Sequence, residues 1–148
     1  MSRRLPRSII FQHSDIKAFG LIHFYDIVGN DIDNGDTKDG LSKIFDFINY
    51  SNKYFDENEP WKLAKDDVRK CEDILFNCCN IIFNINNLLK PYLFETTKKV
   101  EEYLNSNINS WNYQRLEKVE LLKEINPLFI RYDKSRIDEE RKQLNFDA

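Results

Sequence analysis

Apolar residues recur at intervals of three and four along this chain, which is the spacing that lines one face of an α-helix. The first periodic segment begins at Ser14-Asp15, an N-cap followed by an acid, and we expect it to stop at Gly29-Asn30. Its expected buried stripe consists of Ile16, Phe19, Ile22, Tyr25 and Val28. The turn-forming residues that fill positions 30–40 then predict a loop.

Three further helices are predicted in the middle of the chain. The second starts at Asp36 or Thr37, continues to about Tyr54, and is expected to bury Leu41, Ile44, Phe45 and Ile48. Pro60 suits the first position of a third helix, because the N–H that proline lacks has no intrahelical partner there. An acid within residues 65–67 would cap a long fourth helix that Pro91 ends. Its predicted apolar stripe is Val68, Cys71, Ile74, Leu75, Cys78, Ile82, Ile85 and Leu89.

The last third of the sequence is less regular. Another helix is expected after Pro91, to about Leu104, and a polar linker over residues 105–110. Residues 111–125 carry a weak helical stripe made of Leu116, Val119, Leu121 and Leu122. A short final helix is predicted from about Asp133, lying on the bundle with Ile137 and Leu144 among its charges. The pattern therefore predicts an all-α fold, a single bundle of about five helices, with residues 1–14 as a basic tail and 15–148 as the helical domain.

Composition narrows the class of protein. Of the 148 residues, 41% are hydrophobic, and 11 Phe, 7 Tyr and 2 Trp provide enough apolar surface to exclude wholesale disorder. Only 4 Gly and 4 Pro are present, too few for the turns of a many-stranded β fold. A net charge of −3 gives no general attraction for nucleic acid, so such a contact must be local. No apolar run approaches the ~20 residues that span a bilayer, so no membrane partner is expected.

Candidate catalytic and metal sites are weak in this sequence. His13 and His23 lie in no zinc-binding pattern, and the acidic run from Asp31 lacks the Glu that closes a calcium loop at its twelfth position. The glycine-rich phosphate and nucleophile motifs are also absent, so we expect no catalytic residue, metal or cofactor in the chain itself. The three cysteines, Cys71, Cys78 and Cys79, suit a reducing compartment, and we expect a cytoplasmic protein. Arg3, Arg4 and Arg7 loosely resemble an organellar presequence, but a basic tail is the favoured interpretation.

Three motifs carry more specific information. The first is the run Asn52–Lys65, which reads Asn-Lys-Tyr-Phe-Asp-Glu-Asn-Glu-Pro-Trp-Lys-Leu-Ala-Lys. The second is Leu88–Thr97, and the third is Pro127–Asp133, which reads Pro-Leu-Phe-Ile-Arg-Tyr-Asp. In this order and spacing they resemble the C-terminal anticodon-binding domain of methionyl-tRNA synthetases, members of the class I aminoacyl-tRNA synthetases. The resemblance covers about residues 41–140.

The resemblance implies a helical bundle that docks a methionine tRNA, in which the tryptophan of the Pro60-Trp61 step stacks on an anticodon base. Asn52 and Lys53 are further candidates for contacting the anticodon. Each has a structural alternative. Trp61 could seal the turn between two helices, Asn52 could bond to nearby backbone, and Lys53 could be a solvated cation.

The sequence also departs from the family. The family's first helix carries an Asn and an Arg that recognise anticodon bases, and residues 15–29 contain neither residue type. The ATP signatures His-Ile-Gly-His and Lys-Met-Ser-Lys-Ser are missing too, so ATP-dependent methionine–tRNA ligation would need a catalytic domain or subunit outside this chain. The alternative interpretation is a degenerate paralogue that serves as a protein-interaction or structural bundle.

Overall fold

The computed structural model describes residues 18–119 and 125–144, and this part of the chain forms helices without any strand. The helices are α1 (Ala18–Asp33), α2 (Thr37–Asn58), α3 (Pro60–Asp66), α4 (Val68–Leu89), α5 (Phe94–Leu104) and α6 (Lys134–Leu144). The prediction of an all-α bundle is therefore confirmed. The predicted basic tail, residues 1–14, lies outside the described residues.

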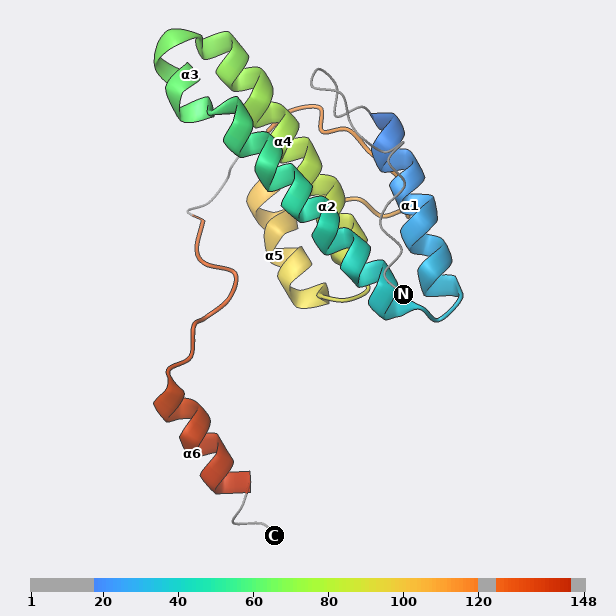
Figure 1. The fold of residues 1–148 in the computed structure, drawn as a ribbon, viewed down its shortest axis with the longest axis vertical. Helices are drawn as coiled ribbons and strands as arrows, with labels where there is room; N and C mark the ends of the chain where they lie inside the picture. The colour runs from blue at the N-terminus through green and yellow to red at the C-terminus, as the bar shows by residue number, and fades with distance from the viewer. Residues whose placement is uncertain (1–17, 120–124, 145–148) are drawn as a thin grey trace.

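The two longest helices form the centre of the bundle (Figure 1). Helices α2 and α4 run side by side, and the short α3 turns the chain between them at one end. Helix α1 packs on both α2 and α4, and α5 packs on α4. Five helices thus make the bundle, and the sixth stands apart from it in Figure 1.

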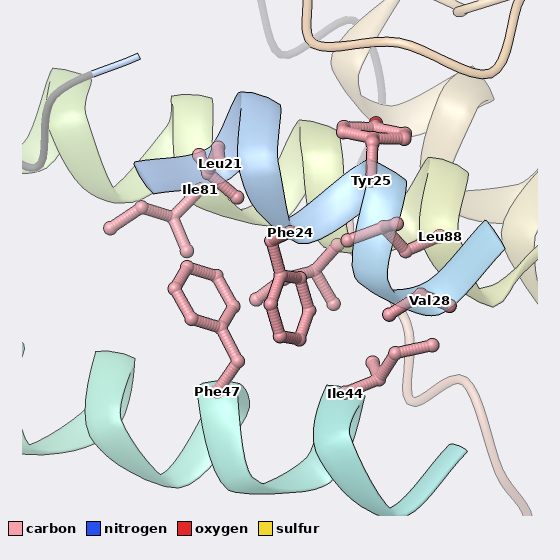
Figure 2. Packing of buried hydrophobic residues seen from close by; sticks show 9 residues of the cluster. Leu21, Phe24, Tyr25, Val28, Ile44, Phe47, Ile81 and Leu88 are labelled. Atoms are coloured by element: carbon pink, nitrogen blue, oxygen red, sulfur yellow. The ribbon is translucent and has the colours of Figure 1, made fainter. Parts of the chain in front are cut away.

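The main core lies where α1 meets α2 and α4 (Figure 2). Its buried members are Leu21, Phe24, Tyr25, Val28, Ile44, Phe47, Ile81, Ile85 and Leu88. The predicted stripes were partly wrong, because Ile22 is 46% exposed and Phe45 is 50% exposed. In α1 the predicted Tyr25 and Val28 are buried, but Leu21 and Phe24 complete the stripe at the spacing i, i+3, i+4 and i+7 in place of Ile22.

The predicted stripe of α4 was also partly wrong, although Cys71, Ile74 and Ile85 are buried as expected. Val68, Leu75 and Ile82 were expected in the core but are exposed, whereas Ile81 and Leu88 are buried. The face of α4 that is buried also carries four asparagines, namely Asn80, Asn84, Asn86 and Asn87. Helix α4 contacts α1 and α2 on one side and α5 on another, so a face that reads as polar in the sequence is covered.

Helix α1 is longer than predicted, and the loop expected over residues 30–40 shrinks to residues 34–36. Gly29 lies inside the helix, which ends at Asp33. Gly35 follows in the loop with a φ of 81°, which only glycine adopts readily. The carboxylate of Asp31, considered above for a calcium loop, forms an ion pair with Lys43 of α2. A lysine in that place further weakens the calcium hypothesis.

Most of the local signals for helix ends are confirmed. Pro60 is the first residue of α3, and the Asp67 carboxylate accepts a 3.1 Å hydrogen bond from the backbone N–H of Lys70 at the start of α4. Helix α4 ends at Leu89, before Pro91, and α5 ends at Leu104, where Asn105 has a positive φ of 47°. Helix α2 extends to Asn58, a turn further than expected.

The helix suspected within residues 111–125 is absent from its described part, residues 111–119. The asparagine side chains of α4 form hydrogen bonds with the backbone at Ser110 and within this segment. The bonds are Leu116 N–H to Asn80 Oδ1 (2.7 Å), Gln114 N–H to Asn84 Oδ1 (3.1 Å), Asn84 Nδ2 to Gln114 O (2.8 Å) and Asn87 Nδ2 to Ser110 O (3.0 Å). Backbone groups that are engaged in this way are not free to form helical bonds.

The last helix, α6, begins one residue from its predicted start. The expectation that it lies on the bundle was wrong, since none of its residues is buried and Figure 1 shows it away from α1–α5. Its two large apolar residues, Ile137 and Leu144, are separated by two turns of charged and polar residues. Two apolar side chains offer little surface for docking.

Candidate functional site

The corner between α2 and α3 has a fixed backbone. Glu59 sits between the helices with a left-handed φ of 43°, and its carbonyl accepts hydrogen bonds from the N–H groups of Lys62 and Leu63. The next residue, Pro60, is buried, and its carbonyl accepts a 3.3 Å hydrogen bond from the thiol of Cys71 on α4. The start of α3 is thereby attached to α4.

Trp61 follows this anchored proline and lies at the surface. Its side chain is 51% exposed, and its ring centroid lies 5.7 Å from that of Phe55, at an interplanar angle of 53°. Phe55, on the last turns of α2, is 37% exposed. The two rings therefore form an aromatic platform that partly faces solvent, and Trp61 is not buried in the turn between α2 and α3. Phe55 was not among the predicted site residues, although its place six residues before Trp61 was a usable signal.

The other two candidate residues, Asn52 and Lys53, lie on the exposed surface of α2. Lys53 Nζ is 3.5 Å from Glu57 Oε1, one helical turn away, so it belongs to a surface ion pair. Asn52 lines an apolar groove between α2 and α4, together with Phe55. The backbone hydrogen bond considered for Asn52 has a counterpart at Asn58, whose Nδ2 donates to the carbonyl of Tyr54 at 2.8 Å.

The charges around the platform are mixed. Lys62 Nζ lies 2.6 Å from Glu59 Oε1, so Lys62, like Lys53, has a carboxylate partner. Lys65, Arg69 and Lys70 follow along α3 and α4, interspersed with Asp66 and Asp67. A phosphate backbone approaching this corner would meet cations and acids together, which reduces long-range attraction.

Cys78 and Cys79 of α4 are not activated as nucleophiles. Burial raises the pKa of the Cys78 thiol to about 11 and also raises the pKa of Cys79. At neutral pH both are thiols, and the thiolate is the reactive form. In the part of the chain that the structure describes, no three His, Cys, Asp or Glu side chains converge as metal ligands. Among these same residues no helix is long and apolar enough to cross a membrane.

Comparison with known proteins identifies relatives of one kind. A methionine–tRNA ligase of Streptococcus pneumoniae is 35% identical over 126 residues, which cover 85% of this chain and 23% of the relative. Methionine–tRNA ligase 1 of Alkaliphilus oremlandii is 38% identical over 120 residues, covering 81% of the chain and 22% of the relative. Methionine–tRNA ligase 2 of Bacillus cereus is 36% identical over 138 residues, covering 93% and 24%. No family model matches the chain.

The chain is thus homologous to a segment of methionine–tRNA ligases and spans about a quarter of the length of these relatives. The resemblance to methionine–tRNA ligases that the three sequence motifs indicated is confirmed. The four candidate residues, Asn52, Lys53, Pro60 and Trp61, all lie at or near the α2–α3 corner.

Proposed function

We propose that this chain is a tRNA anticodon-binding module of the methionyl-tRNA synthetase type, in which Trp61 stacks on an exposed base. One observation carries the proposal. The indole is half exposed at the start of α3, on a backbone held by the buried Pro60 and its bond to Cys71. A stacking residue needs both an open face and a fixed position, and this corner supplies both.

The physical basis is the stacking of a base on an aromatic ring. Such stacking contributes about 1–3 kcal/mol per base, and single-stranded RNA loops present the unstacked bases that it requires. Phe55 supports one side of the platform and widens its apolar surface. The mixed charges of the corner make stacking, and not phosphate attraction, the main source of affinity there.

Methionine tRNA is the proposed ligand because the relatives are methionine–tRNA ligases. The chain lacks the ATP signatures of the family, so we propose that ligation, with ATP as its cofactor, is carried out by a catalytic domain or subunit with which this module works. The family's base-reading Asn and Arg have no counterpart within residues 15–29. We therefore expect that changing the anticodon of the tRNA raises the Kd less than replacing Trp61 by Ala does.

The test is binding of initiator and elongator methionine tRNAs to the full chain at low and physiological salt. Trp61→Ala should raise the Kd about tenfold, equivalent to ~1.4 kcal/mol, and Trp61→Phe should retain most of the affinity. Phe45→Ala is the matched control, because Phe45 is equally exposed on α2 but belongs to no aromatic pair with Trp61. Equal Kd values for Trp61→Ala and the unaltered chain would overturn the stacking role.

A second candidate function is that of an interaction module derived from the same ancestor. It is favoured by the exposed apolar residues between residue 125 and the end of α6, since Ile130 and Leu144 are both 74% exposed. This candidate predicts a folded chain that binds no tRNA at low salt. It would also require that substitution of Ile130 by Ser weakens association with a protein partner.

A further inference from the structure

A small cavity lies at the end of α4 that is far from the α2–α3 corner. It has a volume of about 230 Å³, and its lining includes Asn87, Lys90, Ile108, Ser110 and Trp111. Pockets for drug-sized ligands enclose about 300–1,000 Å³, so this one suits a single ring system. Helix α4 has 22 residues and is therefore about 33 Å long. The cavity and the aromatic platform at Trp61 are thus separate sites.

Trp111 gives the cavity an aromatic wall of fixed orientation. Its indole nitrogen is hydrogen-bonded to the backbone carbonyl of Tyr25 in α1, and the same edge of the ring lies against Gly29. The residue is nevertheless 39% exposed. An aromatic ring that is held in place and still partly open to solvent is a surface on which a flat ligand can stack.

The buried amide of Asn87 supplies a hydrogen-bond acceptor. Asn87 is only 4% exposed, and its Nδ2 donates to the Tyr25 hydroxyl and to the Ser110 carbonyl, both at 3.0 Å. These two bonds use both hydrogens of the amide and fix its orientation. In the part of the chain that the structure describes, no group donates to Asn87 Oδ1. The cavity lining therefore contains one unused acceptor, which suits an N–H donor on a ligand.

Lys90 adds a donor without adding net charge. Its Nζ donates to the carbonyl of Ile108 and forms an ion pair with Glu101 of α5. The carboxylate offsets the ammonium charge, so the cavity has little attraction for an anion such as phosphate. An ammonium group has three N–H donors, and these two partners leave one of them for an acceptor on a ligand.

We propose that this cavity binds a nucleobase that carries an exocyclic amino group, adenine above all. Asn87 and Lys90 lie one turn apart on the same face of α4, and adenine presents an amino donor beside a ring-nitrogen acceptor. The amino group donates to Asn87 Oδ1, the ring nitrogen accepts from Lys90, and the base stacks on Trp111. A purine covers more of the indole than a pyrimidine does. The proposal does not depend on tRNA binding at Trp61.

The first test uses the fluorescence of Trp111. The chain has two tryptophans, so Trp61→Phe leaves Trp111 as the only indole. Adenosine should quench its fluorescence saturably, with a Kd of about 1 mM. Purine riboside lacks only the amino group of adenosine, and its Kd should be about fivefold higher because Asn87 Oδ1 stays unpaired.

Trp111→Phe is the matched control, because it leaves Trp61 as the only indole. Trp61 lies outside the cavity, so quenching at this ring should not distinguish adenosine from purine riboside. Trp61→Ala tests the α2–α3 corner and not the cavity. The proposed tRNA contact and the nucleobase site can therefore fail separately.

A second measurement uses the unaltered chain and does not depend on the stability of a variant. After photolabelling with 8-azidoadenosine, mass spectrometry should find the label on residues 87–91 or 108–111, and excess adenosine should remove most of it. AMP and a short single-stranded oligoadenylate are compared as competitors. Stronger competition by the oligonucleotide identifies RNA as the source of the base, whereas competition by AMP that is equal or stronger identifies a free nucleotide.

The proposal is overturned if adenosine causes no saturable quenching in the Trp61→Phe chain. Equal Kd values for adenosine and purine riboside would show that Asn87 does not recognise the amino group, and would overturn it as well. A photolabel that lies only on other residues, or that adenosine does not displace, would show that the base binds elsewhere.

Discussion

The indole Nε1 of Trp111 donates a 3.0 Å hydrogen bond to the backbone carbonyl of Tyr25, which lies 86 residues earlier in α1. The two rings meet edge to face, with centroids 5.5 Å apart and an interplanar angle of 85°. The Tyr25 hydroxyl in turn accepts a 3.0 Å bond from Asn87 Nδ2 and donates to the carbonyl of Asn84. One aromatic pair therefore connects α1, α4 and the irregular segment after α5.

Gly29→Ala should destabilise the fold, although alanine favours helix. A Cβ at position 29 would lie 2.8 Å from Trp111 Nε1, closer than packing allows, and the hydrogen bond to Tyr25 keeps the indole from moving. We expect a net loss of about 1–2 kcal/mol in urea unfolding, an overpacking cost reduced by the gain in helix propensity. In a Trp111→Leu background the same substitution should be neutral or stabilising. A loss of equal size in both backgrounds would contradict this contact.

Asn84→Ala should be among the most destabilising substitutions in the chain. Asn84 is fully buried, its amide donates to the carbonyls of Asn80 and Gln114, and its Oδ1 accepts from the backbone N–H of Gln114. Its removal takes away a fully buried amide and the side-chain partner of the Gln114 N–H and C=O groups, at a cost of about 2–4 kcal/mol.

Hydrogen exchange of the Gln114 amide reports directly on the bond to Asn84. In Asn84→Ala this exchange should accelerate by more than the loss of global stability explains. Asn77→Ala is the matched control, since Asn77 lies exposed on the same helix and its removal should cost less than about 0.5 kcal/mol. Retained protection of the Gln114 amide in Asn84→Ala would argue against the network.

Local chemistry made the helix boundaries predictable, and tertiary packing decided the rest. Pro60 and Asp67 mark helix starts through their own backbone and side-chain geometry, which sequence alone reveals. The choice between Leu21 and Ile22 as the buried residue depends on where α2 and α4 lie, since both positions fit a helical stripe. The buried face of α4 was missed because its four asparagines look like surface residues until their backbone partners are known.

The candidate site shows the same division. The Pro60-Trp61 step was found from its motif, but the exposure of the indole depends on how α3 is attached to α4 by the Cys71 bond. Phe55 escaped notice because periodicity alone assigns it no face, and only the turn at Glu59 brings its ring to Trp61.

Glu57→Gln with Glu59→Gln should strengthen tRNA binding if the proposed function holds. The two glutamates pair with Lys53 and Lys62 beside the aromatic platform. Releasing the lysines makes them available to phosphate, and each new contact should steepen the slope of log Kobs against log salt by about 0.7–0.9. The expected gain is severalfold at low salt and small at high salt, measured by titration of methionine tRNA.

The matched control changes the same net charge far from the corner. Glu139→Gln with Glu140→Gln on α6 makes the chain less negative by the same two units but leaves Lys53 and Lys62 paired. If both double variants gain the same affinity for tRNA, the effect is due to net charge. The result would then give no support to the α2–α3 corner as a tRNA contact.

Tyr25 should make the fold sensitive to alkaline pH. Burial raises its pKa from 10.0 to about 12, against a smaller opposing effect of the Asn87 hydrogen bond. The folded state therefore keeps the phenol proton that the unfolded state loses near pH 10, so this stabilisation is complete below pH 10 and is lost as pH rises toward 12. The free energy of unfolding falls by ~1.4 kcal/mol per pH unit within that window.

Tyr25→Phe should flatten the fall in the free energy of unfolding between pH 10 and 11, measured by urea unfolding. Cys78→Ser, which removes a thiol of pKa about 11, should instead flatten it from pH 9. Parallel curves for Tyr25→Phe and the unaltered chain would contradict the raised pKa of Tyr25.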